Sequence, residues 1–179
     1  MRPSNRTAIV EAALRVATRQ GGADFSYETT ATEAGLTKAG VLYHFPSRED
    51  LVLAVVEHVA RTWEHAMLEA LGRPFDEATP AQRIRAYVEV AAGDDVSRGD
   101  FAIYADAVCR PAHAGPWNEV FSRWFDLTGV PPRLRARMTT ARFAADGLWV
   151  AKATGALPPV AEDHDALVAH LLSLTEEDR

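Results

Sequence analysis

The chain has 179 residues and a mass of 19.6 kDa, a length typical of one domain or two small ones. Its 19 Lys and Arg against 25 Asp and Glu give a net charge of -6, and 47% of its residues are hydrophobic. This balance excludes a disordered tail, a collagenous repeat and a disulfide scaffold, and the acidity argues against a protein that binds polyanions over its whole surface.

Segments with helical spacing of apolar residues alternate with Gly and Pro clusters along the whole chain. No stretch shows the period-2 alternation of a strand, so we predict an all-α protein. The expected helices cover residues 4–20, 27–34, 38–45, 48–71, 80–92, 98–110, 116–128, 132–154 and 163–175. Ser26, Thr37 and Ser47 suit helix N-caps, because their hydroxyls can accept hydrogen bonds from unpaired backbone N–H groups.

The two short helices at 27–34 and 38–45 are separated only by Gly35-Leu36-Thr37. This is the spacing of a helix-turn-helix, in which the second helix enters the major groove of DNA. Gly35 suits the left-handed residue that ends the first helix, and Thr37 suits the cap of the second. A plain helical corner is the alternative, and the residues around the motif argue against it.

The flanking residues extend the motif into a longer signature. Ile9 to Leu14, Gly22 and the run from Ala34 to Leu51, with Tyr43-His44-Phe45-Pro46-Ser47-Arg48 at its centre, resemble the N-terminal region of TetR-family transcriptional regulators. Two positions depart from the family pattern. Thr30 stands where the family usually has Ile, and Gly40-Val41-Leu42 stands where Thr-Leu-Tyr is usual.

The resemblance implies a two-domain architecture and a function. Residues 1–50 would form a three-helix bundle with the helix-turn-helix, joined by a long helix to a helical ligand-binding and dimerisation domain at 51–179. It also implies a homodimer whose paired recognition helices read a palindromic operator in double-stranded DNA, and a small-molecule effector that releases the DNA. We therefore expect a ligand-responsive transcriptional regulator, and a repressor in particular.

Nine residues are assigned to the DNA surface. Residues 37–44 would face base edges in the major groove, where small side chains let the backbone approach closely. The residues around them would hold phosphates. A packing role fits His44 as well as a base contact does. A solvated position fits Arg48, although a cation at a helix start is better explained by a phosphate partner. The full set is Ser26, Tyr27, Thr37, Lys38, Ala39, Gly40, Tyr43, His44 and Arg48.

Aromatic residues concentrate in the second half of the chain, several at helical spacing. The plain interpretation is a core stripe, and the functional one is an apolar pocket for a small apolar or aromatic effector. The residues assigned to this pocket are Trp63, Met67, Phe101, Tyr104, Trp117, Phe121, Trp124 and Phe143. By analogy with the family, the last two helices would form the dimer interface through Thr140, Phe143, Ala144, Gly147, Ala151, Leu167 and Leu171.

The sequence predicts a protein without catalytic residues, metal or cofactor. It contains no phosphate loop, nucleophile elbow, zinc-protease motif or dinucleotide fingerprint. Cys109 has a basic neighbour that could activate a thiolate, but we expect it to be a small buried hydrophobe. His58, His65 and Glu69 have helical spacing that could bind a metal, but solvated side chains explain them as well. The stronger rival to the DNA-binding hypothesis is a helical protein–protein interaction module.

The distribution of charge agrees with a DNA-binding N-terminal part. Residues 1–50 carry six basic and six acidic residues, whereas residues 51–179 carry 13 and 19, so the excess acidity lies entirely in the second part. No secretion signal or membrane-length apolar run is evident, and we expect a cytoplasmic protein that does not engage membranes.

Overall fold

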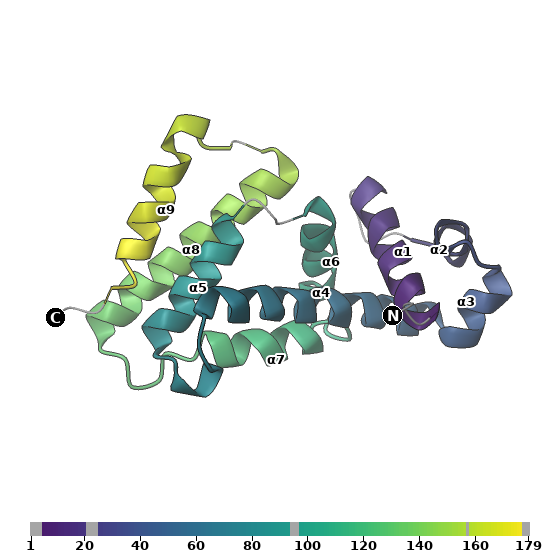
Figure 1. Cartoon of the computed structure of the whole chain (residues 1–179), viewed down its shortest axis with the longest axis horizontal. Helices are drawn as coiled ribbons and strands as arrows, with labels where there is room; N and C mark the ends of the chain where they lie inside the picture. The colour runs from purple at the N-terminus through teal and green to yellow at the C-terminus, as the bar shows by residue number, and fades with distance from the viewer. Residues whose placement is uncertain (1–4, 21–24, 94–96, 157, 177–179) are drawn as a thin grey trace. The chain divides into compact units, whose positions relative to one another are not determined.

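The computed structural model describes residues 5–20, 25–93, 97–156 and 158–176, and within these ranges all regular elements are helices (Figure 1). The all-α prediction is confirmed. Ser4 and Gly22 lie outside the described residues. The elements are α1 (Asn5–Gln20), α2 (Tyr27–Ala34), α3 (Lys38–His44), α4 (Arg48–Leu71), η1 (Phe75–Glu77), α5 (Pro80–Ala92), α6 (Arg98–Val108), α7 (Gly115–Trp124), α8 (Pro132–Thr154), η2 (Ala161–Asp163) and α9 (His164–Ser173). Among the described residues, no helix is long and apolar enough to cross a membrane.

Three predicted helices extend two or more residues too far at their C-terminal ends, and the one predicted at 163–175 stops at Ser173. The helix predicted at 116–128 stops at Trp124, because the Asp126 carboxylate accepts from the backbone N–H of Thr128 at 2.9 Å and Gly129 turns to a φ of 78°. The helix predicted at 98–110 stops at Val108. The expected burial of Cys109 is wrong: this residue caps the end of α6 and is exposed.

The chain divides into two compact units. The first comprises Met1–Arg61 and Ser97–Asn118, and the second comprises Thr62–Val96 and Glu119–Arg179. The division therefore falls inside α4 and inside α7, where the backbone remains helical. The domain boundary predicted at residue 50 follows the sequence motif and stays a prediction.

In the first unit, α1 packs against α2, α3 and α6 (Figure 1). Its core includes the apolar faces of α1 and α4, together with Phe25 and Phe45, which lie just before α2 and just after α3. α6 approaches α1 so closely that a Cβ on Gly99 would lie 2.0 Å from Thr18 Oγ1. Only glycine fits at this position without displacing α1 or α6.

One buried histidine joins separate segments of the first unit. His113, which is 3% exposed, has its Nε2 atom 2.6 Å from Oε1 of Glu49, at the start of α4. Its Nδ1 atom lies 3.7 Å from Oδ2 of Asp106, on α6. A polar contact with Glu49 therefore fixes the segment that contains α6 to α4, and close packing at Gly99 fixes it to α1.

In the second unit, α5 packs against α8, and α9 packs against both (Figure 1). Thr79 and Gln82 form a reciprocal capping box at the start of α5, and Pro80 occupies its first turn. The core is rich in aromatic side chains: the Trp63 and Trp149 rings lie 4.4 Å apart, and Tyr87 is 1% exposed.

Candidate nucleic-acid interface

Local hydrogen bonds build the turn between α2 and α3. Gly35 ends α2 in the left-handed conformation, with φ 65° and ψ 31°. The Thr37 side chain caps α3 by accepting from the backbone N–H of Gly40 at 3.1 Å. Ser26 and Thr29 form a reciprocal capping box at the start of α2. The three cap roles predicted from the sequence for this motif are confirmed, and they fix the two short helices in a helix-turn-helix.

The outer face of α3 is exposed although the helix is firmly anchored. Val41 is completely buried, whereas Lys38 and Ala39 are exposed and the Tyr43 side chain is 83% exposed. Leu42, at 37% exposed, lies beside them. Tyr43 and Leu42 therefore form an exposed apolar surface on a helix that Val41 anchors to the core. Such a surface is suited to contact with a partner.

The remaining residues assigned to the DNA surface surround this face. Ser26, Thr37 and Arg48 are exposed, and Gly40 and His44 are half-buried. The His44 ring meets that of Tyr43 edge-on, with centroids 5.2 Å apart, and both the packing role and the base contact of His44 stay predictions. None of the nine assigned residues is buried.

Tyr27 has a structural bond that the sequence did not reveal. Its hydroxyl donates to the backbone carbonyl of Phe45 at 2.9 Å and thereby ties the start of α2 to the end of α3. Burial raises the pKa of the Tyr27 phenol, the Asp50 charge raises it further, and the Arg48 charge opposes the change. A phenol donates one hydrogen bond, so a phosphate contact through this O–H would replace the bond to Phe45.

Ser47, predicted as an N-cap, forms a capping box with Asp50 at the start of α4. The backbone N–H of Asp50 donates to Ser47 Oγ at 3.0 Å, and the backbone N–H of Ser47 donates to Asp50 Oδ2 at 3.0 Å. The box places Arg48 at the first position of α4, exposed to solvent.

Acidic side chains neutralise several of the basic residues of this unit. Glu33 on α2 accepts from Arg15 at 2.7 Å and from Arg19 at 2.6 Å, and these bonds lower the pKa of its carboxyl to about 2. Lys38, at the start of α3, forms an ion pair with Glu28. Sequence reasoning missed Glu28 because the two residues are ten positions apart and meet only across the turn.

Arg6 is a second residue that sequence reasoning did not assign. Its guanidinium lies over the Phe45 ring, 4.8 Å from the centroid, which brings a cation from α1 to the end of α3. Several arginines near the N-terminus were the available signal, and packing against Phe45 shows that Arg6 lies near the end of α3.

The residues assigned to an effector pocket separate into two groups. Tyr104 and Trp117 belong to the first unit, where their rings meet edge-on with centroids 5.1 Å apart, and Phe101 on α6 is half-buried there. Trp63, Met67 and Trp124 are buried in the second unit, and Phe121 is half-buried. Phe143 is 59% exposed and lies on the surface of that unit.

The second unit also contains aromatic and acidic side chains that the sequence analysis did not single out. Tyr87 packs edge-on against Phe125, with centroids 4.8 Å apart, and its hydroxyl donates to the carboxylate of Asp146 on α8. Burial raises the pKa of Asp146, while the bond from Tyr87 and the charge of Arg142 oppose this shift. Arg142 lies over the Phe125 ring at 4.7 Å and over that of Phe143 at 4.3 Å. This cluster therefore already accommodates a cation against aromatic faces.

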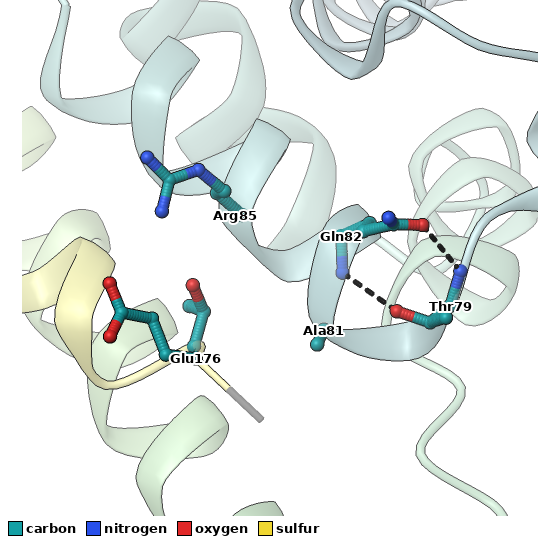
Figure 2. A pocket seen from close by; sticks show the side chains of 6 residues that line it. Thr79, Ala81, Gln82, Arg85 and Glu176 are labelled. Atoms are coloured by element: carbon teal, nitrogen blue, oxygen red, sulfur yellow. Dashed lines mark hydrogen bonds between the residues drawn. The ribbon is translucent and has the colours of Figure 1, made fainter. Parts of the chain in front are cut away.

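A pocket of about 230 Å³ opens beside the start of α5 and the chain after α9 (Figure 2). Its lining comprises Thr79, Ala81, Gln82, Arg85, Thr175 and Glu176, and it includes none of the residues assigned to the effector pocket. Figure 2 shows the Thr79–Gln82 capping bonds within this lining. Arg85 pairs with Glu89 at 3.1 Å, so several polar groups here already serve the local structure.

The residues assigned to a dimer interface include an exposed stripe on α8. Thr140, Phe143 and Gly147 are exposed at a spacing of three and four residues, and Val150, at 40% exposed, continues the same face. Ala144 and Ala151 are half-buried. On α9, Leu167 is 38% exposed, whereas Leu171 is 6% exposed and packs into the unit's own core.

Of the side chains considered as metal ligands or nucleophiles, His65 pairs with Glu69 at 3.4 Å and Cys109 is exposed. In the part of the chain that the structure describes, no group of three or more His, Cys, Asp or Glu is arranged to hold a metal ion.

The fold and the exposed, capped α3 define a helix-turn-helix DNA-binding regulator, and comparison with known proteins identifies its family. Residues 9–55 match the family model for bacterial regulatory proteins of the tetR family, and residues 81–176 match that for the tetracyclin repressor-like C-terminal domain. The chain belongs to the TetR family of transcriptional regulators. Such regulators bind DNA operators and small-molecule effectors and function as dimers, and they are not enzymes.

Individual relatives agree over nearly the whole chain. The HTH-type transcriptional regulator BetI of Brucella anthropi is 27% identical over 190 residues, which cover 97% of this chain and 94% of the relative. A structure from Saccharomonospora viridis, solved in complex with choline, superposes with a TM-score of 0.69 at 21% identity, covering 94% of this chain and 93% of that one. The multidrug binding protein EbrR, complexed with malachite green, gives 0.63 at 20% identity, with 96% and 98% coverage.

Proposed function

We propose that this protein is a homodimeric, ligand-responsive repressor whose α3 helices read the major groove of a palindromic operator. The observation that carries the proposal is the outer face of α3, where Lys38, Ala39 and Tyr43 are exposed while Val41 anchors the helix. Residues 37–44 approach the base edges, and Ser26, Tyr27, Tyr43 and Arg48 contact phosphates. The protein acts on DNA in the cytoplasm.

The first experiment is selection of binding sites from random duplex DNA, followed by fluorescence anisotropy with the enriched sequence. The proposal requires an enriched palindrome and binding that weakens as salt rises, since phosphate contacts release counterions. Lys38→Ala should weaken operator binding and leave the molecular mass of the dimer unchanged. Enrichment of no palindrome would refute the proposal and favour a helical protein–protein interaction module.

We infer that the effector is a small apolar or aromatic molecule bound among the assigned aromatic side chains of the second unit, which include Trp63, Phe121 and Trp124. The Trp63–Trp149 cluster and the neighbouring Tyr87 and Phe125 offer wide aromatic faces, and Asp146 adds a carboxyl group. Aromatic faces also attract organic cations. The ligand panel should therefore contain neutral aromatic compounds and the two cations found with the structural neighbours, choline and malachite green.

The effector test is the release of operator DNA, with tryptophan quenching as an independent readout. A true effector lowers operator affinity and quenches tryptophan over the same concentration range. Such release requires the ligand to bind the two protein states with different affinity. Because α4 contributes residues to both units, a shift of α4 would alter the separation of the recognition helices. If no compound of the panel releases operator DNA or quenches tryptophan fluorescence, the assignment of the pocket is refuted.

The proposed dimer forms through α8 and α9 as a four-helix bundle. The exposed stripe with Phe143 and Gly147 supports this assignment, because an apolar side chain beside a small residue permits close helix packing. Phe143→Glu would place a charge in that interface and should shift the mass measured by light scattering at micromolar concentration from dimer to monomer. Arg133→Gln, at the exposed start of α8, changes the net charge by the same -1 and is the control. A wild-type monomer would refute the proposed dimer.

A further inference from the structure

The first residue of the recognition helix is neutralised by a carboxylate of the preceding helix. Lys38 begins α3 and Glu28 is the second residue of α2, and their side chains form an ion pair while 54% and 64% exposed. The hydrogen bond from Lys38 is the main cause that lowers the pKa of the Glu28 carboxyl. The carboxylate is therefore ionised at neutral pH, as its ion pair with Lys38 requires.

This pairing creates an electrostatic conflict with the DNA surface. A carboxylate that contacts Lys38 lies where Lys38 would meet a phosphate, so it repels the same phosphate that the lysine attracts. The Debye length is about 8 Å at physiological salt, so charges in contact remain coupled while distant ones are screened. The pair as a whole adds no net charge to the face of the molecule that meets the DNA.

We propose that Glu28 competes with the DNA backbone for Lys38 and thereby restrains binding to DNA of any sequence. DNA binding exchanges the Lys38–Glu28 pair for a Lys38–phosphate pair and leaves Glu28 facing the DNA. Because this exchange contributes little binding free energy, operator affinity depends more on base contacts along α3. Glu28 therefore acts as a specificity-determining residue. This inference rests on the proposed function, since it assumes that α3 faces DNA.

Glu28→Gln is the direct test, measured with a non-specific duplex and with the selected operator between roughly 50 and 300 mM salt, a range where counterion release dominates. The variant should bind non-specific DNA several-fold more tightly. Its log–log salt dependence should steepen by about 0.9 for each protomer bound, because the charge of Lys38 at the phosphate is no longer offset by the Glu28 carboxylate. The ratio of operator to non-specific affinity should fall. Glu69→Gln makes the same charge change on α4, where Glu69 forms an exposed pair with His65. This control should leave the non-specific affinity, the salt slope and the affinity ratio unchanged.

A double variant separates competition from independent roles. Lys38→Ala alone leaves Glu28 as an unpaired anion at the interface and should weaken binding to both duplexes. Adding Glu28→Gln should restore the wild-type salt slope and recover most of the lost non-specific affinity. Since both side chains are exposed, the helix-turn-helix should keep its fold, which circular dichroism verifies.

The outcomes distinguish this inference from the proposed function. If wild-type protein binds its operator but Glu28→Gln leaves the salt slope unchanged, the competition is refuted and the DNA-binding function stands. If Glu28→Gln weakens operator binding, Glu28 is a direct DNA contact and the inference is wrong. If the wild-type chain selects no operator, the proposed function itself fails.

Discussion

Replacing Gly40 by alanine should make the protein more stable and a poorer DNA binder. Gly40 is the third residue of α3, and an ordinary negative φ leaves its conformation open to any residue. A Cβ there would lie 3.4 Å from Thr37 Oγ1 and 3.9 Å from Leu36 Cβ, which are ordinary contacts. No contact within the described part of the chain therefore requires glycine at this position, although glycine lowers the stability of the helix.

The expected gain follows from the loss of backbone freedom in the unfolded chain. Gly→Ala within a helix contributes about 0.5–1 kcal/mol, which in a chain of this size raises the melting temperature by roughly 1–4 °C. On the DNA side, the same methyl group would occupy the space through which the α3 backbone approaches the bases. We therefore expect Gly40→Ala to weaken operator binding about tenfold, which corresponds to about 1.4 kcal/mol of binding free energy.

Thermal unfolding by circular dichroism and anisotropy titration with the selected operator measure the two effects on one preparation. Thr30→Val is the matched control, since it should stabilise the same unit from the buried side of α2 without touching the DNA surface. Higher stability with unchanged operator affinity would refute a close approach of DNA to Gly40. Lower stability would show that the added methyl group does not fit beside the Thr37 cap.

Three further substitutions test the packing and electrostatics of the first unit. Thr30 is completely buried, and among the described residues its hydroxyl has no hydrogen-bond partner, so Thr30→Val should raise the free energy of unfolding by about 1–2 kcal/mol in chemical denaturation. Gly99→Ala should lower it by about 1–3 kcal/mol, because the new Cβ overlaps Thr18 Oγ1; a neutral result would mean that α6 does not pack on α1 as described. The depressed pKa of Glu33, about 2 against 4.5, means that its stabilising contribution is complete above pH 4.5 and disappears as the pH falls towards 2. Glu33→Gln should therefore flatten the acid dependence of stability in that range, and an unchanged curve would argue against its pairing with the α1 arginines.

The structure changes how the charge of the DNA-binding unit is understood. Counting residues gives equal numbers of acidic and basic side chains in residues 1–50, and the structure shows that much of this balance consists of direct ion pairs. Arg15 and Arg19 share Glu33, and Lys38 holds Glu28. Such a unit gains little from unspecific attraction to DNA, so its affinity should come from specific contacts and from dimerisation.

The sequence by itself determined the helices and the turn of the recognition motif. Helix periodicity, the left-handed Gly35 and the Thr37 and Ser26 caps depend on residues within four positions of one another. Interactions between residues this close in the chain can be predicted directly from the order of the residues. The family signature around Tyr43-His44-Phe45 combines the same local features, which explains why the fold class and the DNA-binding motif could both be predicted.

Only the tertiary structure decided which side chains meet across the fold and which are exposed. The Glu28–Lys38 pair and the His113–Glu49 contact join residues brought together by packing. No local pattern shows that Phe143 lies on the surface or that Cys109 is exposed, because burial depends on which neighbouring helix covers a residue. Helix formation is governed mainly by neighbours in the chain, whereas the charge and accessibility of a binding surface are governed by neighbours in space.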